Sequence, residues 1–538
     1  MPRMADTPRP AAATASEHDH GITETLKSLV MAFVLAMTFR GFVTEGFVIP
    51  TGSMAPTLMG RHELVHSDAT GSTFRVGMDT NQPGAAAWSV ADPMLGPGFE
   101  GWGTTSRPAQ PRNGDRILVL KTLYPFFEPE RFDVVVFKNP TEPHGDSANY
   151  IKRLIGLPNE KIWLADGDVF AGPADDPERI DDYVIQRKPE HVQRAVWQLV
   201  HHSDFVPGPD PAARIDFRYP GSPWSGEGWT TDGTRIYECD TAAPTVLTWN
   251  NDVREIDDWT AYNQGANGST ITETVCDIRV GAGVTRAQAG LRMTLQLVAR
   301  SHVFEFIVTE DSAAVRMRPL AGVAEWVEDV QPISLGKAGK VFAVEFWHVD
   351  QSMSIYLDGE RVAYLEYDWL PLNRLRYATG TPAELASSVD RMIEMRPDPA
   401  EIAWRFEGSP VALHRVRVDR DLHYQATLMR GSGANLPRQG YADLVGPGWG
   451  FGTHPTKPAV LGPDHFWMLG DNSARSQDGR VWGSPHMLVA EQIDPSPFVV
   501  HRKLMIGKAW VVYFPAMYPL SDRGASFIPD FGRMRFIR

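Results

Sequence analysis

The sequence predicts a mainly β protein with one N-terminal transmembrane helix and a second β-rich unit inserted into the first. Two observations lead to this fold class. Short apolar, β-branched runs bounded by turn residues recur along the chain, as expected of strands. With 538 residues, the chain is also too long for one ordinary hydrophobic core, so at least two folded units are expected.

The N-terminal region is interpreted as a disordered tail over 1–24 and a transmembrane anchor over 25–48. The tail is rich in Ala, Pro, Thr and acidic residues, a composition typical of disorder. The apolar run Leu29–Phe39 has only eleven residues, so it can span a bilayer only if Arg40 and Glu45 lie near an interface. A cleaved signal peptide and a buried helix are the alternatives. The uncleaved anchor is favoured because cleavage requires a basic n-region, and acidic residues outnumber basic ones here.

The first folded unit is predicted in two parts, over 49–175 and 461–538. Its first part contains strand patterns such as "FDVVVFK" and a loop-like stretch rich in Gly, Ala, Ser and Pro over 67–112. A Gly- and Pro-rich linker over 426–460 leads into the second part, where strand patterns resume.

The segment 176–425 between these parts is predicted to form a separate β-sandwich. It contains many evenly spaced short strand patterns, which are typical of a sandwich. Asp358-Gly359 lies between two of them and predicts a hairpin, because this pair readily adopts the positive φ angles of a tight turn.

Composition narrows the classes of partner. The formal net charge of −14 argues against nucleic acid, because phosphate binding requires a basic face. Two cysteines are too few for a disulfide framework or a four-cysteine zinc site. An oxidising compartment would allow Cys239 and Cys276 to pair, but ordinary unpaired residues near strands are the favoured interpretation.

A candidate nucleophile, Ser53, follows the predicted anchor directly, in "FVIPTGSMAPTL". A serine needs a base to become nucleophilic, and the chain has no G-x-S-x-G motif that would tie a histidine to it. A buried lysine, kept neutral by desolvation, is another base of this kind. Lys152 lies within the apolar strand pattern "YIKRLIGL" and is the candidate, although most strand lysines simply face solvent.

Several sequence blocks occur together in a fixed order. They are "IPTGSMAPTL", "GDRILVLK" with "FDVVVFKNP", "YIKRLIGLPNEKIWLADGDVF" and "GDNSARSQDGRVWG". With these blocks in this order, the sequence resembles bacterial signal peptidase I, the membrane-bound Ser-Lys peptidase that removes signal peptides from exported proteins. The resemblance covers about 25–60, 113–170 and 460–515, which is less than half of the chain.

The resemblance implies roles for individual residues. Ser53 matches the nucleophile and Lys152 the general base, and no metal or cofactor is implied. The hydroxyl of Thr51 matches the group that joins the backbone N–H of Ser53 in an oxyanion hole. The supporting residues are Ser476, which orients the lysine, Asp478 and Arg480, which form a structural ion pair, and Met54 and Pro56, which shape the surroundings of the nucleophile. Asp471 and Asn472 are expected to act in a turn rather than in proton transfer.

The resemblance also implies the substrates and the location. The substrates are preproteins with small residues, typically Ala, at the first and third positions before the cut. The protein is expected in the inner membrane, in contact with lipid, with the tail in the cytoplasm and both folded units on the periplasmic face. The sequence departs from the family at Ser473, Gly479, Asn159 and Phe132. Gly479 stands behind the site where the family usually has a serine, and this difference puts the catalytic efficiency of the peptidase in doubt.

The insert weakly resembles a laminin-G or concanavalin-like jelly roll, on the evidence of "FWHVDQSMSIYLDGERVAYLEYD" and "VALHRVRVDRDLHY". Its ligand is unknown. Trp347, Tyr356 and Tyr364 are candidates to line a ligand groove, although ordinary core and surface positions are favoured. Asp350 and Asp358 are candidate calcium ligands, although solvated turn residues are favoured because clustered carboxylate spacing is lacking.

Two other functions compete with an active peptidase. A membrane-anchored recognition protein would bind a glycan or protein through the sandwich and keep the peptidase as an inactive frame. Joint retention of Ser53, Lys152, Thr51 and Ser476 disfavours this alternative. A self-cleaving Ser-Lys regulator of the phage-repressor type would need a basic helix-turn-helix module, which the sequence lacks.

Overall fold

The fold is mainly β and is built from antiparallel sheets. The computed structural model describes residues 16–538 except 68, 79–89, 98–111, 145–147, 207–220, 266–271, 323, 383–387, 430–447, 516–517, 520–525 and 529. Most of the predicted tail (1–24), much of the predicted loop (67–112) and half of the predicted linker (426–460) therefore lie outside the described residues.

An eight-stranded sheet forms the first unit and collects strands from both ends of the chain. Lys152 lies on β6, which runs antiparallel to its neighbours β5 and β28. Apolar side chains cover both faces of this sheet, so even Lys152 and Arg153 of β6 are buried. The strands are β1 (Thr44–Val48), β4 (Arg116–Leu120), β30 (Met505–Phe514), β5 (Val134–Lys138), β6 (Asn149–Gly156), β28 (His465–Leu469), β29 (Val500–His501) and β33 (Arg535–Phe536).

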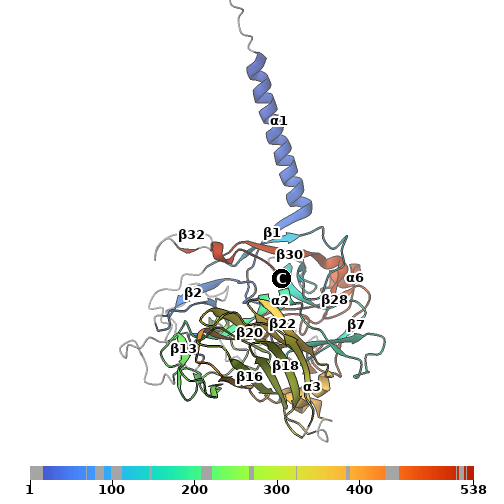
Figure 1. Ribbon diagram of the computed structural model, residues 1–538. Helices are drawn as coiled ribbons and strands as arrows, with labels where there is room; N and C mark the ends of the chain where they lie inside the picture. The colour runs from blue at the N-terminus through green and yellow to red at the C-terminus, as the bar shows by residue number, and fades with distance from the viewer. Residues whose placement is uncertain are drawn as a thin grey trace, which may run out of the picture.

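Two stacked sheets form the second unit, which occupies the lower part of Figure 1. Apolar side chains from both sheets, such as Leu413 and Trp404, share one core, which defines a sandwich. The first sheet contains β12 (Trp229–Thr230), β13 (Ile236–Cys239), β24 (Val411–Arg420), β15 (Ile278–Arg286), β20 (Val341–Val349), β21 (Ser352–Leu357), β22 (Glu360–Glu366) and β10 (Gln198–His202). The second contains β11 (Trp224–Ser225), β14 (Thr245–Trp249), β23 (Glu401–Glu407), β16 (Arg292–Ala299), β17 (His302–Val308), β18 (Ser312–Pro319) and β19 (Val327–Pro332).

Local features of the sandwich follow the sequence closely. Asp358 and Gly359 have φ angles of 50° and 89° and join β21 to β22, so the predicted hairpin is confirmed. Cys239 and Cys276 are both buried and unpaired, as the favoured interpretation expected.

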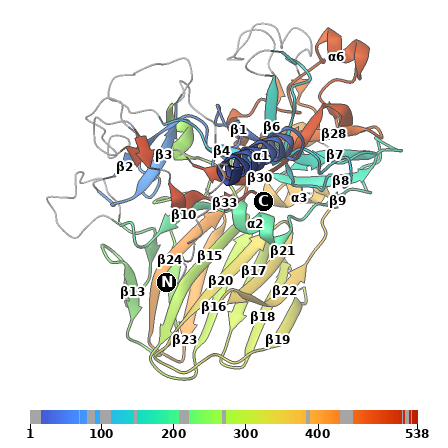
Figure 2. The same ribbon diagram turned by 90° about the horizontal axis from the view of Figure 1, so that it is seen from above.

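A smaller four-stranded sheet lies between the two units (Figure 2). Two helices, α3 and α4, interrupt the series of sandwich strands and were not predicted from the strand patterns. They pack against this sheet through Leu375 and Met392. Helix α2 packs on its other side through Val192 and Val196. The elements are β27 (Ala459–Val460), β7 (Glu160–Ala165), β8 (Asp168–Pro173), β9 (Val184–Ile185), α2 (Glu190–Val196), α3 (Pro371–Ala378) and α4 (Val389–Glu394).

Short elements complete the described chain. They are η1 (Phe39–Val43), the hairpin β2 (His62–His66) and β3 (Thr73–Gly77), η2 (Ala261–Gly265), β25 (Leu428–Met429) with β26 (Gly448–Trp449), η4 (Ser473–Arg475), α6 (Met487–Gln492), η5 (Arg502–Leu504), β31 (Tyr518–Pro519) with β32 (Ser526–Ile528), and η6 (Phe531–Arg533).

The structure corrects the predicted transmembrane anchor over 25–48. Helix α1 (Ser16–Thr38) projects from the body of the molecule (Figure 1), but residues 44–48 form β1, which pairs with β4. Within the part of the chain that the structure describes, no helix combines the length and apolar character needed to cross a membrane. The short apolar run, ended by Arg40, accounts for this difference.

A buried ion network joins the sandwich to the four-stranded sheet. Arg374 of α3 binds Asp166 and Asp168, at the turn between β7 and β8, at 2.9 and 2.7 Å. It also binds Asp277, beside β15, at 2.9 Å. Arg300 bridges Asp166 and Asp277 at 2.6 and 2.7 Å. These charges are almost fully buried, so each depends on its partners for stabilisation.

Replacing Arg374 by Met is expected to lower the free energy of unfolding by about 3–5 kcal/mol, because three buried carboxylates lose a cationic partner. Chemical denaturation measures this change. The control is Arg292→Met, since Arg292 and its partner Glu407 are about half exposed and such pairs contribute about 0–1 kcal/mol. Equal effects of the two substitutions would contradict the assignment of the network as a structural junction.

Candidate active site

Ser53 lies on a loop between β1 and β2 whose apolar side chains anchor it in the core of the large sheet. Met54 and Leu58 are fully buried in the same apolar cluster as Ile49. The backbone N–H of Leu58 donates to the Met54 carbonyl at 2.8 Å, which closes a helical turn. Met54 therefore anchors the loop in the apolar core, whereas the resemblance implied that it shapes the entry around the nucleophile.

Lys152 of β6 reaches the candidate nucleophile directly. Its Nζ donates a hydrogen bond to Ser53 Oγ at 2.6 Å, and only 3% of Lys152 is exposed. Desolvation by burial lowers the pKa of Lys152 from 10.5 to about 8, because the charged amine loses its hydration. Asp478 and Asp471 act in the opposite direction, and Arg480 assists the lowering. The strand pattern thus places a lysine beside the serine and keeps part of its population neutral.

Two buried bidentate ion pairs flank the lysine. Arg480 Nε and Nη2 each donate to Asp478 at 2.9 Å, and the second Asp478 oxygen also accepts from the backbone N–H of Gly470 at 3.0 Å. Arg153, the neighbour of Lys152, binds Asp471 at 2.8 and 2.6 Å. Sequence reasoning missed the pair of Arg153 and Asp471, although two consecutive cations in an apolar strand were a signal for it.

Asn472 holds the backbone of the nucleophile loop. Its own N–H donates to the Ser53 carbonyl at 3.0 Å, and its side-chain amide donates to the Gly52 carbonyl at 2.9 Å. The sequence suggested only a turn role for Asn472. The turn after β28 is thereby fastened to the segment that carries the serine.

Thr51 and Ser476 occupy different environments near this loop. Thr51 is exposed, and Gly60 packs so closely against its peptide group that a Cβ there would lie 2.2 Å from the Thr51 carbonyl carbon. The Ser476 hydroxyl is buried beside Gly470 and makes no hydrogen bond to any described residue. Its predicted contact with Lys152 is therefore not formed in this conformation.

The residues suggested as ligands in the insert serve packing and charge pairing instead. Trp347 and Tyr356 are 3% and 2% exposed and pack against each other at 4.4 Å between ring centroids, with their planes tilted by 38°. Asp350 is buried, contrary to the expectation of a solvated turn residue, and binds Lys188 at 2.5 Å. Asp358 lies in the hairpin turn and accepts from the Ala343 N–H at 2.8 Å.

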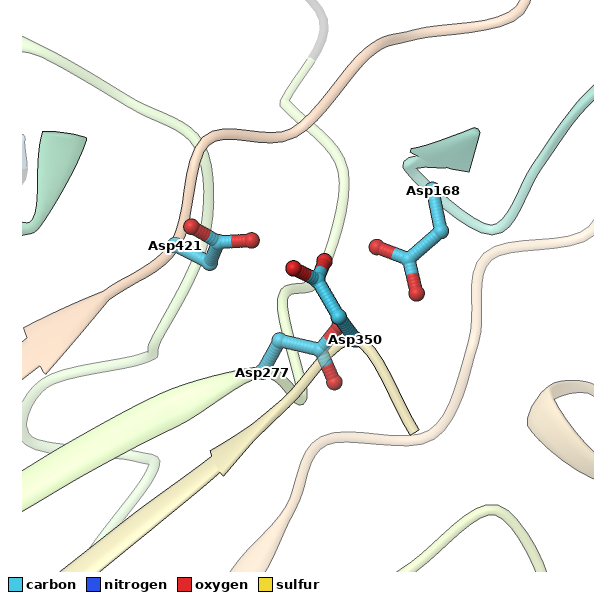
Figure 3. Close-up of side chains that lie close together, drawn as sticks. All are labelled: Asp168, Asp277, Asp350 and Asp421. Carbon is cyan, nitrogen blue, oxygen red and sulfur yellow. The ribbon is translucent and has the colours of Figure 1, made fainter. Parts of the chain in front are cut away.

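Four aspartates at the junction offer the one carboxylate cluster of metal-binding size among the described residues (Figure 3). Their oxygen atoms lie within 4.8 Å of one another. Lys188 binds two of them, Asp350 and Asp421, at 2.5 and 2.8 Å, and Arg374 binds Asp168 and Asp277. Protein cations already neutralise this cluster, so its donor set does not fit an additional metal ion.

The site thus combines a part-buried serine–lysine contact with two buried ion pairs on a β scaffold. Residues 22–78 and 103–198 match the sequence profile described as "Signal peptidase, peptidase S26". This part of the chain is therefore similar to the signal peptidase S26 family.

Curated relatives agree with this assignment at low identity. Signal peptidase I of Pseudomonas aeruginosa is 28% identical over 160 residues, which cover 30% of this chain and 40% of that protein. The Rickettsia massiliae protein is 32% identical over 143 residues, which cover 27% of this chain and 40% of that protein. The Leptolyngbya laminosa protein is 26% identical and matches 36% of this chain and 71% of that protein. The chain thus spans about two fifths of the length of the first two relatives.

Solved structures similar to another part of the chain are β-sandwiches. The laminarinase catalytic domain from Thermotoga petrophila aligns with 42% of this chain and 98% of its own, at 9% identity and a TM-score of 0.25. Carbohydrate binding module CBM66 from Bacillus subtilis aligns with 38% of this chain and 99% of its own, at 10% identity and a TM-score of 0.22.

Gly479, where the family usually has a serine, faces the indole of Trp467. A Cβ at this position would lie 2.4 Å from Trp467 Nε1, so Gly479→Ser is expected to destabilise the protein by about 1–3 kcal/mol through overpacking. Thermal unfolding measures the effect. The matched control is Gly336→Ser, because a Cβ there meets nothing within 4 Å. A Gly479→Ser protein as stable as wild type would refute this explanation of the departure.

Proposed function

We propose that the protein is a membrane-associated serine endopeptidase that removes signal peptides from exported preproteins with a Ser-Lys dyad. The observation that carries the proposal is the 2.6 Å contact between Lys152 Nζ and Ser53 Oγ. Similarity to the S26 family supports preproteins as the substrate class.

The pKa of Lys152 makes this chemistry effective near neutral pH. A lysine with a pKa of about 8 is about one tenth neutral at pH 7, roughly 300-fold more than a lysine with a pKa near 10.5. The neutral amine accepts the Ser53 proton while the serine attacks the scissile carbonyl. The same amine then activates the water that hydrolyses the acyl-enzyme.

The remaining roles follow the family pattern. The Thr51 hydroxyl and the Ser53 backbone N–H are the proposed donors to the oxyanion, since two converging donors are needed where negative charge develops. Ser476 is the proposed orienting group for Lys152, and its buried, unpaired hydroxyl is available for that contact after a rotation about χ1. Asp478 and Arg480 are proposed to hold the end of β28 behind Lys152.

Helix α1 supplies the proposed membrane attachment. Its apolar side chains are exposed on all sides, with Leu29, Met31 and Phe33 between 63% and 72% exposed. Soluble proteins rarely leave so much contiguous apolar surface uncovered. Attachment near Ser53 would bring a membrane-tethered cleavage site close to the dyad.

Ser53→Ala and Lys152→Ala are each expected to abolish cleavage of a preprotein with an Ala-x-Ala site, because one removes the nucleophile and the other its base. Gel analysis and N-terminal sequencing of the product measure the cut. Lys138→Ala is the matched control, since Lys138 is an exposed lysine on the adjacent strand β5 and its loss should leave activity intact. Retained cleavage in either dyad variant would refute the dyad.

The pH profile of kcat/KM is expected to rise about tenfold per unit below pH 8 and to level off above it. Protonated Lys152 cannot accept the serine proton, and its pKa of about 8 sets the position of the limb. Initial rates between pH 5.5 and 9.5 test this. A limb near pH 6, typical of histidine, would exclude Lys152 as the base.

Replacing Leu29, Met31 and Phe33 together by Ser is expected to abolish flotation with vesicles of phosphatidylethanolamine and phosphatidylglycerol. The substitutions remove most of the apolar area that drives insertion. Cleavage of a soluble peptide should persist. Unchanged flotation would contradict attachment through α1.

The alternative, a recognition protein, draws support from one feature of the sandwich. The outer face of the sheet that contains β16 and β23 forms an open groove of about 490 Å³. Arg292, Arg316 and Arg405 line it together with Glu305 and Glu407, a polar surface suited to a hydroxylated or charged ligand. Ligand binding by a protein that cleaves no preprotein would favour this function.

A further inference from the structure

We propose that the inserted sandwich contributes two positioning residues to the peptidase site, Tyr262 and Asn263. Both lie on the short helix η2 (Ala261–Gly265), which belongs to the insert and lies more than 200 residues after Ser53. This inference rests on the proposed Ser-Lys chemistry and assigns to the insert a part in it.

Asn263 forms a reciprocal amide pair with Asn472. Asn263 Nδ2 donates to Asn472 Oδ1 at 2.9 Å, and Asn472 Nδ2 donates to Asn263 Oδ1 at 2.8 Å. Because Asn472 also binds the carbonyls of Gly52 and Ser53, its orientation fixes the backbone of the nucleophile loop. Asn263 sets that orientation, since the pair occupies both ends of the Asn472 amide.

Tyr262 packs against the same loop from one side. An ideal Cβ on Gly52 would lie 2.2 Å from Tyr262 Cε1, so the ring contacts the peptide that precedes the nucleophile. The Tyr262 hydroxyl donates to the Arg61 carbonyl at 3.3 Å, and the N–H of Arg61 bonds the Pro50 carbonyl at 3.3 Å. The ring therefore supports the loop at both of its ends.

The chain that leads into η2 is fixed to the sandwich at Asp258. The backbone of Asp258 pairs with Glu273 at 3.0 Å, and its side chain accepts from the Glu273 N–H at 2.9 Å. Arg420, at the end of β24, donates to the Asp258 carbonyl at 2.9 Å. A rigid strand thus holds η2 against the loop, an arrangement suited to fixing catalytic geometry.

The insert accordingly forms part of the active-site scaffold. A shift in the Asn263–Asn472 pair would move the Ser53 backbone, and with it the 2.6 Å contact to Lys152. Small displacements of this kind reduce turnover more than substrate binding.

The experiment measures kcat and KM for an Ala-x-Ala preprotein with full-length Asn263→Ala, Asn472→Ala and the double variant. Loss of a positioning hydrogen bond is expected to lower kcat of Asn263→Ala by about three- to tenfold, with KM within about twofold of wild type. The double variant should be no slower than Asn472→Ala, because Asn263 acts through Asn472. Multiplicative effects, or an unchanged kcat in Asn263→Ala, would overturn the proposal.

Two further variants separate positioning from folding. Tyr262→Phe keeps the ring and should retain kcat within about twofold, whereas Tyr262→Ala should lose about tenfold. Asn251→Ala removes one 2.9 Å hydrogen bond, to the Ala400 carbonyl, inside the sandwich. It should lower the melting temperature without changing kcat. If Asn251→Ala lowers kcat as much as Asn263→Ala does, general destabilisation explains both and the proposal fails. An inactive wild-type protein would instead refute the proposed function itself.

Discussion

The proposed chemistry depends on keeping part of the Lys152 population uncharged beside the Ser53 hydroxyl. Burial of Lys152 supplies that condition, because the low-dielectric interior disfavours the ammonium ion. Asp478 and Asp471 oppose this effect and raise the pKa of Lys152. Each carboxylate is matched by an arginine in a bidentate pair. Arg480 also lowers the pKa of Lys152, so the cation of this ion pair offsets part of the effect of Asp478.

Buried charge recurs where the sandwich meets the peptidase sheets. The turn between β7 and β8 places Asp166 and Asp168 among cations that belong to the insert. An isolated buried ion is strongly destabilising, so the buried carboxylates of this turn depend on cations from the insert. The insert is therefore attached to the peptidase sheets through buried ion pairs. Helix η2 of the insert adds hydrogen bonds from Asn263 to Asn472, which holds the nucleophile loop.

Local sequence patterns predicted the parts of the fold that depend on neighbouring residues. Asp358-Gly359 identified its hairpin through backbone preference, and the apolar setting of Lys152 indicated a buried lysine. The family resemblance brought Ser53 and Lys152 together as a pair. Asn263 could not be found this way, because an asparagine in a polar segment carries no signal of a partner more than 200 residues away.

Other features were hidden for related reasons. The charges of Arg300 and Arg374 resemble surface charges in sequence, and only the tertiary arrangement buries them. The helices α3 and α4 interrupt the sandwich strands and pack on another sheet, so strand periodicity did not reveal them. The C-terminal end of the N-terminal helix was predicted too late because residues 44–48 resemble a continuing apolar segment, whereas strand pairing with β4 determines their structure. Its start was also predicted too late, since α1 begins at Ser16, within the predicted tail.

The most direct test of the account is to identify an acyl-enzyme. The protein would be mixed with an activated ester of an Ala-x-Ala peptide, quenched in acid within milliseconds and analysed by peptide mass spectrometry. The account predicts an acyl group on the peptide that contains Ser53 in wild type and none in Lys152→Ala. Acylation of another residue, or equal acylation of Ser53 without Lys152, would contradict it.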